Sequence, residues 1–322
     1  MDLLDLALSV ALGRSRFFAG GWGDVALLES EPFGEVAARP PDAVELELGP
    51  AERRDGFLVH SGSFESPEPR LTAGRRVRVR LLEPAGHARA AVLVMAAAGD
   101  QGFTVRETFV APLVRSGTAA LLLENPYYGN RRPVGQAGTA LRTVSDLALM
   151  ISTAVREGRA LTAWLRSRHG RVGVAGYSMG GQTAALIAEA SPFPLAVAAA
   201  APPVTQASVF VTGYLRHVVD LEALGGPEAR PLLQRRLSRI DVLALPPPPR
   251  GSSMVVVGVR RDGIVPPADP AAIAEHWGAE LRWVEAGHVS AVLFHGEALR
   301  RAVRDALDGL RGDSAPDGRA AA

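Results

Sequence analysis

The stretch Val172-Gly173-Val174-Ala175-Gly176-Tyr177-Ser178-Met179-Gly180-Gly181 decides the fold of this 322-residue chain. Its first four residues form an apolar run, which is typical of a strand that is covered on both faces. A helical pattern follows over 182–190. Between the two lies the Gly-x-Ser-x-Gly spacing of a tight strand-to-helix turn that exposes a serine hydroxyl. The alternative is a glycine-rich turn whose serine only caps the helix.

The two outer glycines of this turn have a steric role. We expect side chains at Gly176 and Gly180 to collide with the neighbouring strand and helix. Ser178 would lie at the helix N-terminus, where free N–H groups favour developing negative charge. The spacing therefore predicts that Ser178 is a nucleophile.

Other apolar runs lie on both sides of the turn and alternate with helical patterns. This alternation predicts right-handed βαβ units and a doubly wound, mostly parallel α/β sheet. The run at 76–82 instead alternates apolar residues with arginines, which predicts a half-buried strand at an antiparallel N-terminal edge. The predicted strands are 43–48, 76–82, 91–97, 119–123, 172–175, 195–201, 254–259 and 281–284, and the predicted helices are 104–115, 140–168, 179–190, 268–278 and 290–311.

The chain length suits one large domain with additions. We expect an N-terminal extension of helix and loop over 1–70, a core domain over 71–311 and a disordered tail over 312–322. Residues 204–250 interrupt the alternation and end in four prolines, so they predict a helical cap insertion over the C-terminal edge of the sheet.

The first twelve residues resemble a targeting segment only superficially. Asp2 and Asp5 stand where a signal peptide needs positive charge, and the apolar run is short. An amphipathic first helix is the better interpretation. Because no apolar stretch reaches the length of a transmembrane helix, we expect a cytoplasmic protein without a membrane span.

Composition excludes several chemistries. The chain has no cysteine and no lysine, which removes thiol nucleophiles, cysteine zinc sites, Schiff bases and a Ser-Lys dyad. The formal net charge is +1, and no basic run indicates a nucleic-acid partner. We expect no metal and no cofactor, and nothing in the sequence indicates an oligomeric state.

A serine nucleophile needs a histidine base and an acid that orients it, in the chain order Ser, Asp or Glu, His for this kind of sheet. Of seven histidines, His288 stands between the last predicted strand and the last predicted helix, at the edge where Ser178 also lies. His295 is the nearby alternative. Asp262 follows the preceding strand, in an Asp-Gly pair that a simple turn could also explain. Asp269 and Glu285 are the alternative acids.

An oxyanion hole needs two backbone N–H groups that face the reacting oxygen. The residue after the nucleophile, Met179, supplies one of them in this kind of site. The loop after the strand at 91–97 supplies the other, and we expect Ala98 there.

Four strings in the sequence resemble the α/β-hydrolase domain-containing protein 18 family, from about residue 14 to residue 297. The most specific is Glu124-Asn125-Pro126-Tyr127-Tyr128-Gly129-Asn130-Arg131-Arg132-Pro133. It is accompanied by Arg16-Phe17-Phe18-Ala19-Gly20-Gly21-Trp22-Gly23, by Val144-Ser145-Asp146-Leu147 and by Gly176-Tyr177-Ser178-Met179-Gly180-Gly181.

The resemblance implies the α/β-hydrolase fold and a Ser-Asp-His triad, which maps onto Ser178, Asp262 and His288. Members of the family tend to carry Gly-Thr-Gly-Asp in the oxyanion loop. Here that loop reads Ala97-Ala98-Gly99-Asp100, which keeps the backbone donors but loses a threonine hydroxyl.

Several side chains on loops at the C-terminal edge would lie next to Ser178. We expect some of them to bind substrate or to support the oxyanion loop, whereas the alternative is that the tyrosines only pack in a rigid turn. These predicted substrate-binding residues are Asp100, Glu124, Tyr127 and Tyr128.

Together these patterns predict a serine hydrolase that cleaves carboxylic esters, with a small-molecule or lipid acyl ester as substrate. An acyltransferase would use the same triad and differ only in the acceptor. A non-catalytic binding protein on the same fold would be expected to have a broken triad, and here all three positions are intact.

Overall fold

The computed structural model describes residues 4–5, 16–30, 36–136 and 138–310. Ten strands of this part form one mixed sheet. They are β1 (Glu47–Leu48), β2 (Glu52–Arg54), β3 (Phe57–Glu65), β4 (Arg76–Pro84), β5 (Ala90–Met95), β6 (Thr118–Leu123), β7 (Val172–Tyr177), β8 (Ala196–Ala200), β9 (Ser253–Val259) and β10 (Glu280–Val284).

The spatial order is β1-β3-β4-β6-β5-β7-β8-β9-β10, and β2 pairs with β3. All neighbouring pairs from β6 to β10 are parallel. β4 is antiparallel to both β6 and β3, and β1 is antiparallel to β3. The sheet is therefore mostly parallel, with an antiparallel N-terminal part, as the sequence predicts.

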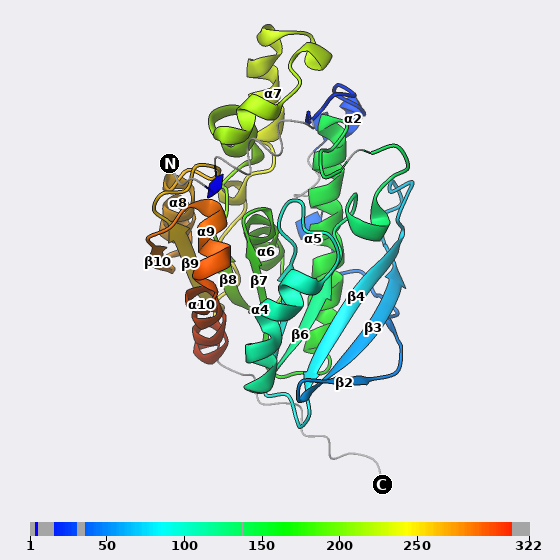
Figure 1. Cartoon of the computed structure of the whole chain (residues 1–322), viewed down its shortest axis with the longest axis vertical. Coiled ribbons are helices and arrows are strands. Elements are labelled where there is room, and N and C mark those ends of the chain that lie inside the picture. The colour runs from blue at the N-terminus through cyan, green and yellow to red at the C-terminus, as the bar shows by residue number, and fades with distance from the viewer. Residues whose placement is uncertain (1–3, 6–15, 31–35, 137, 311–322) are drawn as a thin grey trace.

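Helices cover both faces of the sheet (Figure 1). Alternate residues of β5 show the two faces, because Leu93 packs in one buried cluster and Val92 and Val94 pack in another. The first cluster includes α5 (Val144–Arg166), α6 (Met179–Glu189) and α8 (Ala268–Trp277); the second includes α4 (Thr104–Arg115) and α10 (Gly296–Gly309). Residues buried on both faces explain the continuous apolar runs.

The antiparallel part extends further than the sequence indicated. Phe57–Glu65 was not predicted as a strand, yet it pairs with β4 over nine consecutive positions. Polar residues interrupt its apolar pattern, so its strand conformation depends on the hydrogen bonds with β4. In the predicted strand 43–48 only Glu47 and Leu48 pair, at Ser63 and Gly62.

Two predicted helices differ in their bounds. The pattern at 140–168 forms a helix only from Val144, because Thr143 and Asp146 make a reciprocal capping box there. The pattern at 290–311 is divided into α9 (His288–Phe294) and α10, with His295 between them. The first of these two helices begins at the predicted catalytic histidine.

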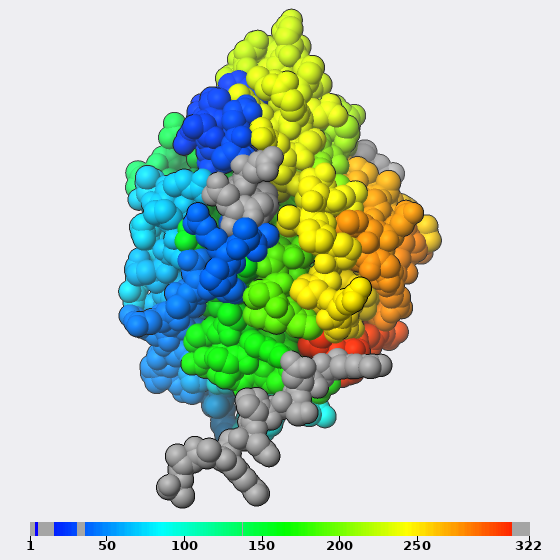
Figure 2. Space-filling view, turned by 180° about the vertical axis from the view of Figure 1, so that it is seen from behind, coloured from blue at the N-terminus to red at the C-terminus, as the bar shows by residue number. Residues whose placement is uncertain are grey.

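Residues 204–250 lie between β8 and β9 and contain only short helices: η2 (Ser208–Thr212), η3 (Tyr214–Val218), η4 (Glu222–Leu224), η5 (Pro227–Ala229), α7 (Arg230–Leu237) and η6 (Val242–Ala244). The N-terminal segment with α2 (Val25–Glu29) packs against this region, as Figure 2 shows from behind. Trp22 Nε1 donates to Leu224 O at 3.1 Å, and the Arg236 guanidinium carbon lies 4.5 Å from the centroid of the Trp22 ring.

The expected first helix over 1–12 lies outside the described residues except for Leu4 and Asp5, and the expected tail over 312–322 lies wholly outside them. Among the helices of the described part, none combines the length and the apolar character that crossing a bilayer requires.

Candidate active site

Ser178 stands between β7 and α6 in the strained turn that the sequence predicts. Its φ is +56°, a left-handed value that few non-glycine residues adopt. The Ser178 N–H donates to Ala200 O on the neighbouring strand at 2.8 Å, and its carbonyl accepts from Gln182 N at 3.0 Å. The turn is thus fixed to the sheet and to the helix, with the hydroxyl at the C-terminal edge.

The two glycines of the turn allow this close approach. A Cβ at Gly176 would overlap the carbonyl oxygen of Gly180 in the helix. A Cβ at Gly180 would lie 2.7 Å from the carbonyl oxygen of Met95 on β5. The expected steric role of both positions is confirmed.

The structure brings the three predicted catalytic side chains into one hydrogen-bonded chain. His288 Nε2 lies 2.9 Å from Ser178 Oγ, and His288 Nδ1 lies 2.6 Å from Asp262 Oδ2. The Asp262 side chain is 2% exposed and the His288 side chain 9%. This is the geometry that a serine nucleophile, its base and an orienting acid require.

The other oxygen of Asp262 has its own partners. Asp262 Oδ1 accepts hydrogen bonds from Ile264 N and Val265 N, each at 2.8 Å. The Asp-Gly pair does form a turn, and that turn also fixes the carboxylate plane. Asp262 Oδ1 therefore binds the loop backbone, and Asp262 Oδ2 contacts the His288 imidazole.

Tyr177, which precedes the serine, contacts the histidine directly. The Tyr177 hydroxyl donates to the His288 carbonyl oxygen at 2.6 Å, and the centroids of the two rings lie 5.0 Å apart. Burial, together with the nearby carboxylates of Asp262 and Asp5, raises the pKa of Tyr177 well above its ordinary value. The hydroxyl therefore stays protonated and remains a donor.

The loop after β5 contains Ala98 and approaches the nucleophile turn, since Ala97–Asp100 and Gly176–Tyr177 line the same pocket. Met179 is the first residue of α6. Asp100 accepts from Arg106 Nε at 2.6 Å, and the same guanidinium donates to Leu123 O at 2.7 Å and to Gly102 O at 2.8 Å. A buried arginine thus fixes this loop to the end of β6.

The residues of the 124–133 string are mostly buried and bond to the chain itself. Glu124 Oε1 accepts from Asn130 N at 3.0 Å, and Asn125 Nδ2 donates to Ala96 O at 3.1 Å. Burial raises the pKa of Tyr128 to about 12. A hydrogen bond with the Gly99 backbone has the opposite, smaller effect on this pKa. Burial and the Asp146 carboxylate raise the pKa of Tyr127.

These contacts place Asn125 and Tyr128 against the loop that holds Ala98, and they turn Tyr127 toward α5. Direct contact with substrate stays a prediction for Asp100, Glu124, Tyr127 and Tyr128. The contacts of Tyr128 and Asp100 favour support of the loop that contains Ala98.

A mostly apolar pocket of about 780 Å³ lies beside this loop. Its floor is made by side chains of β5, β7, β8 and β9, including Val94, Ala175, Ala198 and Val257. Its walls come from α4, α9 and α10, and include Phe109, Val292, Leu293, Phe294, Leu299 and Val303. It therefore lies on the α4 and α10 side of the sheet.

The chain also matches a known protein family over most of its length. A family model described as alpha/beta hydrolase domain containing 18 covers residues 15–230 and 227–309. The chain belongs to this family. The resemblance that the four sequence strings carry is thereby confirmed.

Solved structures share the fold of this α/β-hydrolase at low sequence identity. The acetyl xylan esterase from Paenibacillus sp. R4 has a TM-score of 0.64 and 17% identity, with 92% of this chain and 98% of that chain covered. Acetyl xylan esterase 1 from Thermoanaerobacterium sp. JW/SL YS485 has a TM-score of 0.57 and 15% identity, covering 91% and 97%. The peroxisomal α/β-hydrolase Lpx1 from Saccharomyces cerevisiae has a TM-score of 0.55 and 12% identity, covering 82% and 92%. The expected α/β-hydrolase fold is confirmed.

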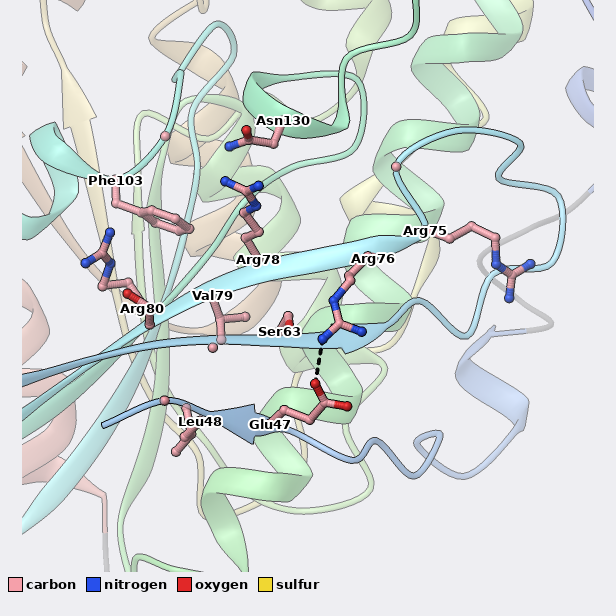
Figure 3. A pocket seen from close by; sticks show the side chains of 15 residues that line it. Glu47, Leu48, Ser63, Arg75, Arg76, Arg78, Val79, Arg80, Phe103 and Asn130 are labelled. Atoms are coloured by element: carbon pink, nitrogen blue, oxygen red, sulfur yellow. Dashed lines mark hydrogen bonds and ion pairs between the residues drawn. The ribbon is translucent and has the colours of Figure 1, made fainter. Parts of the chain in front are cut away.

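A second hollow, of about 890 Å³, lies along β3 and β4 of this α/β-hydrolase (Figure 3). Arg76, Arg78 and Arg80 come from the polar face of β4, and Arg76 pairs with Glu47 at 2.5 Å. Arg80 lies 3.3 Å from a Glu107 oxygen. The residues that line the hollow lie at positions 47–49, 61–63, 74–76, 78–80, 102–103 and 130, and none of them belongs to the triad or to its neighbouring turns.

In the described residues, no group of three or more His, Asp or Glu side chains is arranged as metal ligands. Sequence reasoning missed three residues that contact the site: Arg106, Tyr177 and Asp5. Tyr177 lies inside the nucleophile motif, but nothing in the local pattern indicates that Asp5 reaches the histidine.

Proposed function

We propose that this α/β-hydrolase is a serine hydrolase that cleaves carboxylic esters through an acyl-enzyme. The hydrogen-bonded chain from Ser178 Oγ through His288 to Asp262, with distances of 2.9 and 2.6 Å, carries the proposal. Two of the solved structures with this fold are named acetyl xylan esterases, so ester hydrolysis occurs on this scaffold.

In the acylation step Ser178 Oγ forms a bond to the ester carbonyl carbon while His288 Nε2 accepts the hydroxyl proton. The carbonyl oxygen becomes an oxyanion, which the Met179 and Ala98 N–H groups stabilise. The bond from carbon to the alcohol oxygen then breaks, and His288 returns its proton to the leaving alcohol. Asp262 stabilises the imidazolium that forms in between.

In the deacylation step a water molecule attacks the acyl carbon and gives its proton to His288. The bond between Ser178 Oγ and the acyl group breaks, and His288 returns the proton to the serine. A carboxylic acid leaves and the free enzyme is restored. The proposed chemistry uses no metal and no organic cofactor.

The apolar pocket supports an ester with a hydrophobic acyl group, including lipid acyl esters. Its lining contains none of the three triad side chains but includes Tyr177, which directly precedes Ser178. Small side chains such as Ala175 and Ala198 leave space on its floor, and its charged rim residues are paired within the chain, as Arg106 is with Asp100 and Arg300 with Glu297. Leu293 and Phe294 are 60% and 72% exposed at this pocket. A pocket of this size and lining suits a neutral hydrocarbon group.

We also propose that residues 204–250 act as a cap on the core domain, with the N-terminal extension packed beside it. The contacts of α6 support this, because Gln182, one turn after the nucleophile, donates to Val204 O at 3.2 Å and to Ile240 O at 3.3 Å. The insertion is therefore bound to the helix that carries Ser178.

A fluorophosphonate probe tests the proposal, since it modifies only an activated serine. The wild-type protein should be labelled at Ser178, as mass spectrometry of the peptides would show. The S178A variant should not react, whereas S167A, a substitution of an exposed serine at the end of α5, should react like the wild type. An unlabelled wild-type protein beside a labelled control hydrolase would refute the proposed mechanism.

Product analysis separates hydrolysis from acyl transfer. With p-nitrophenyl esters of increasing chain length, the proposal predicts release of the free acid and a preference for chains longer than acetate. If added alcohols captured the acyl group in preference to water, the enzyme would instead be an acyltransferase that uses the same residues.

A further inference from the structure

The carboxylate of Asp5 lies against the backbone of the turns that carry Asp262 and His288, although it precedes His288 by 283 positions. Its side chain is buried, with the residue 2% exposed. Asp5 Oδ2 accepts from His288 N at 2.9 Å and from Gly263 N at 3.1 Å. Asp5 Oδ1 accepts from Val289 N at 2.8 Å.

These three N–H groups belong to the two turns that carry the acid and the base. Gly263 directly follows Asp262, and His288 and Val289 form the first turn of α9. N–H groups in a first helical turn have no acceptor within the helix, so they need a partner elsewhere. A carboxylate is the strongest acceptor that the chain offers for them.

The backbone of His288 is consequently fixed from both sides. Asp5 accepts from its N–H, and the Tyr177 hydroxyl donates to its carbonyl oxygen. The side chain is fixed separately by Asp262. Asp5 Oδ2 thus links Gly263, the residue after Asp262, to His288.

We propose that Asp5 is a positioning residue that holds His288 at the distance and angle required to accept the Ser178 proton. The inference rests on the proposed Ser-His-Asp mechanism and adds to it a residue from the N-terminal segment. Asp5 acts through the backbone of His288, because its carboxylate accepts from His288 N, Val289 N and Gly263 N.

Other contacts keep the two turns together when Asp5 is removed. Arg261 N donates to Ala286 O at 3.0 Å and joins the two turns, and Ser290 Oγ accepts from Gly287 N at 2.8 Å within the turn that carries His288. The loss of Asp5 should therefore loosen His288 without unfolding the sheet edge. Because small errors in the position of a catalytic group slow the chemical step, D5A should lower kcat by about ten- to a hundredfold.

The test compares D5A and D5N with the wild type and with D24N. Asp24 is a matched control, because its carboxylate also accepts a backbone N–H group at the start of a short helix. The donor is Leu27 N of α2, at 3.1 Å. We expect a lower kcat with an unchanged KM for D5A, and a smaller loss for D5N, which keeps one acceptor oxygen. D24N should keep the wild-type kcat.

A second readout is independent of turnover. The proton between His288 Nδ1 and Asp262 should give a resolved downfield proton resonance in the wild type, and D5A should shift or broaden it while D24N leaves it unchanged. Thermal unfolding of each variant checks that the fold is kept, and D5N, which has nearly the shape of aspartate, decides the matter if D5A does not fold.

The outcomes separate this inference from the proposed function. If the wild type neither hydrolyses esters nor reacts with the fluorophosphonate, the mechanism itself fails. If the wild type is active and D5N and the folded D5A keep its kcat and its downfield resonance, the mechanism stands and Asp5 is not a positioning residue. A rise in KM at constant kcat would also overturn the inference, because it would indicate a substrate contact.

Discussion

The substitution D262N should nearly abolish activity while leaving the loop intact, and the reason lies in the two N–H groups that face Asp262 Oδ1. Ile264 N and Val265 N both donate to that oxygen at 2.8 Å. In asparagine the amide oxygen must take this place, because an NH₂ group there would face two donors. The NH₂ group then occupies the place of Oδ2, 2.6 Å from His288 Nδ1.

This orientation reverses the tautomer of the histidine. The asparagine NH₂ donates to Nδ1, so the imidazole proton moves to Nε2, which faces Ser178 Oγ at 2.9 Å. A protonated Nε2 has no lone pair for the serine proton. By analogy with serine proteases, kcat/KM should fall by about 10⁴, equivalent to about 5 kcal/mol of transition-state stabilisation.

The assay is hydrolysis of a p-nitrophenyl ester, with the rate of fluorophosphonate labelling as a second measure. D269N and E285Q are the matched controls, since Asp269 and Glu285 are the other acids that the sequence offered. Asp269 accepts from Val204 N at 2.9 Å, and the exposed Glu285 pairs with Arg260 at 3.5 Å. Both controls should keep the wild-type rate.

Two results would refute the reasoning. One is a D262N variant whose kcat/KM stays within about tenfold of the wild type. The other is a loss in D269N or E285Q that equals the loss in D262N, because it would assign the acid to another carboxylate.

Three further predictions concern groups around the site and in the core. R106M should lower the melting temperature and slow the labelling of Ser178 by about tenfold or more, since the loop with Ala98 loses its attachment to the strand ends. E157L should lower the free energy of unfolding by about 3–5 kcal/mol, because it leaves the fully buried Arg131 guanidinium without its carboxylate, and R131M/E157L should recover part of this loss in denaturant titrations. Burial raises the pKa of Glu189 to about 9 from an ordinary value of 4.5, so the native state binds a proton between these pH values that the unfolded chain releases. The free energy of unfolding should therefore fall with rising pH in that range, by at most about 1.4 kcal/mol per pH unit, and E189Q should remove this dependence in melts measured across it.

Much of the fold followed from local patterns. The strands from β5 to β9 are predictable because residues covered on both faces must be apolar, and the runs that meet this condition are visible in the sequence. β3 was missed because polar residues break its apolar alternation and its strand hydrogen bonds come from β4. The break between α9 and α10 was missed because the helical pattern continues across His295.

Some residues of the proposed site could also be predicted from the sequence, and others could not. Ser178, Asp262 and His288 could be named in advance because each follows a recognisable strand and the chain order is a property of the fold. Asp5 could not, because it lies in a separate segment and its partners are backbone N–H groups, which every residue except proline carries. No residue type marks such a partner in a sequence.

The sequence by itself determined the strand-turn-helix around Ser178 and the sheet class, and it predicted the order of the three proposed catalytic residues, because strand burial and glycine sterics are local and leave a pattern of residue types. Only the tertiary structure decided which carboxylate meets His288, that Asp5 fixes the backbone of that histidine, and that the apolar pocket lies between α4, α9 and α10. Those features depend on how distant segments pack, and packing is selected by the shape and hydrogen bonding of the whole core.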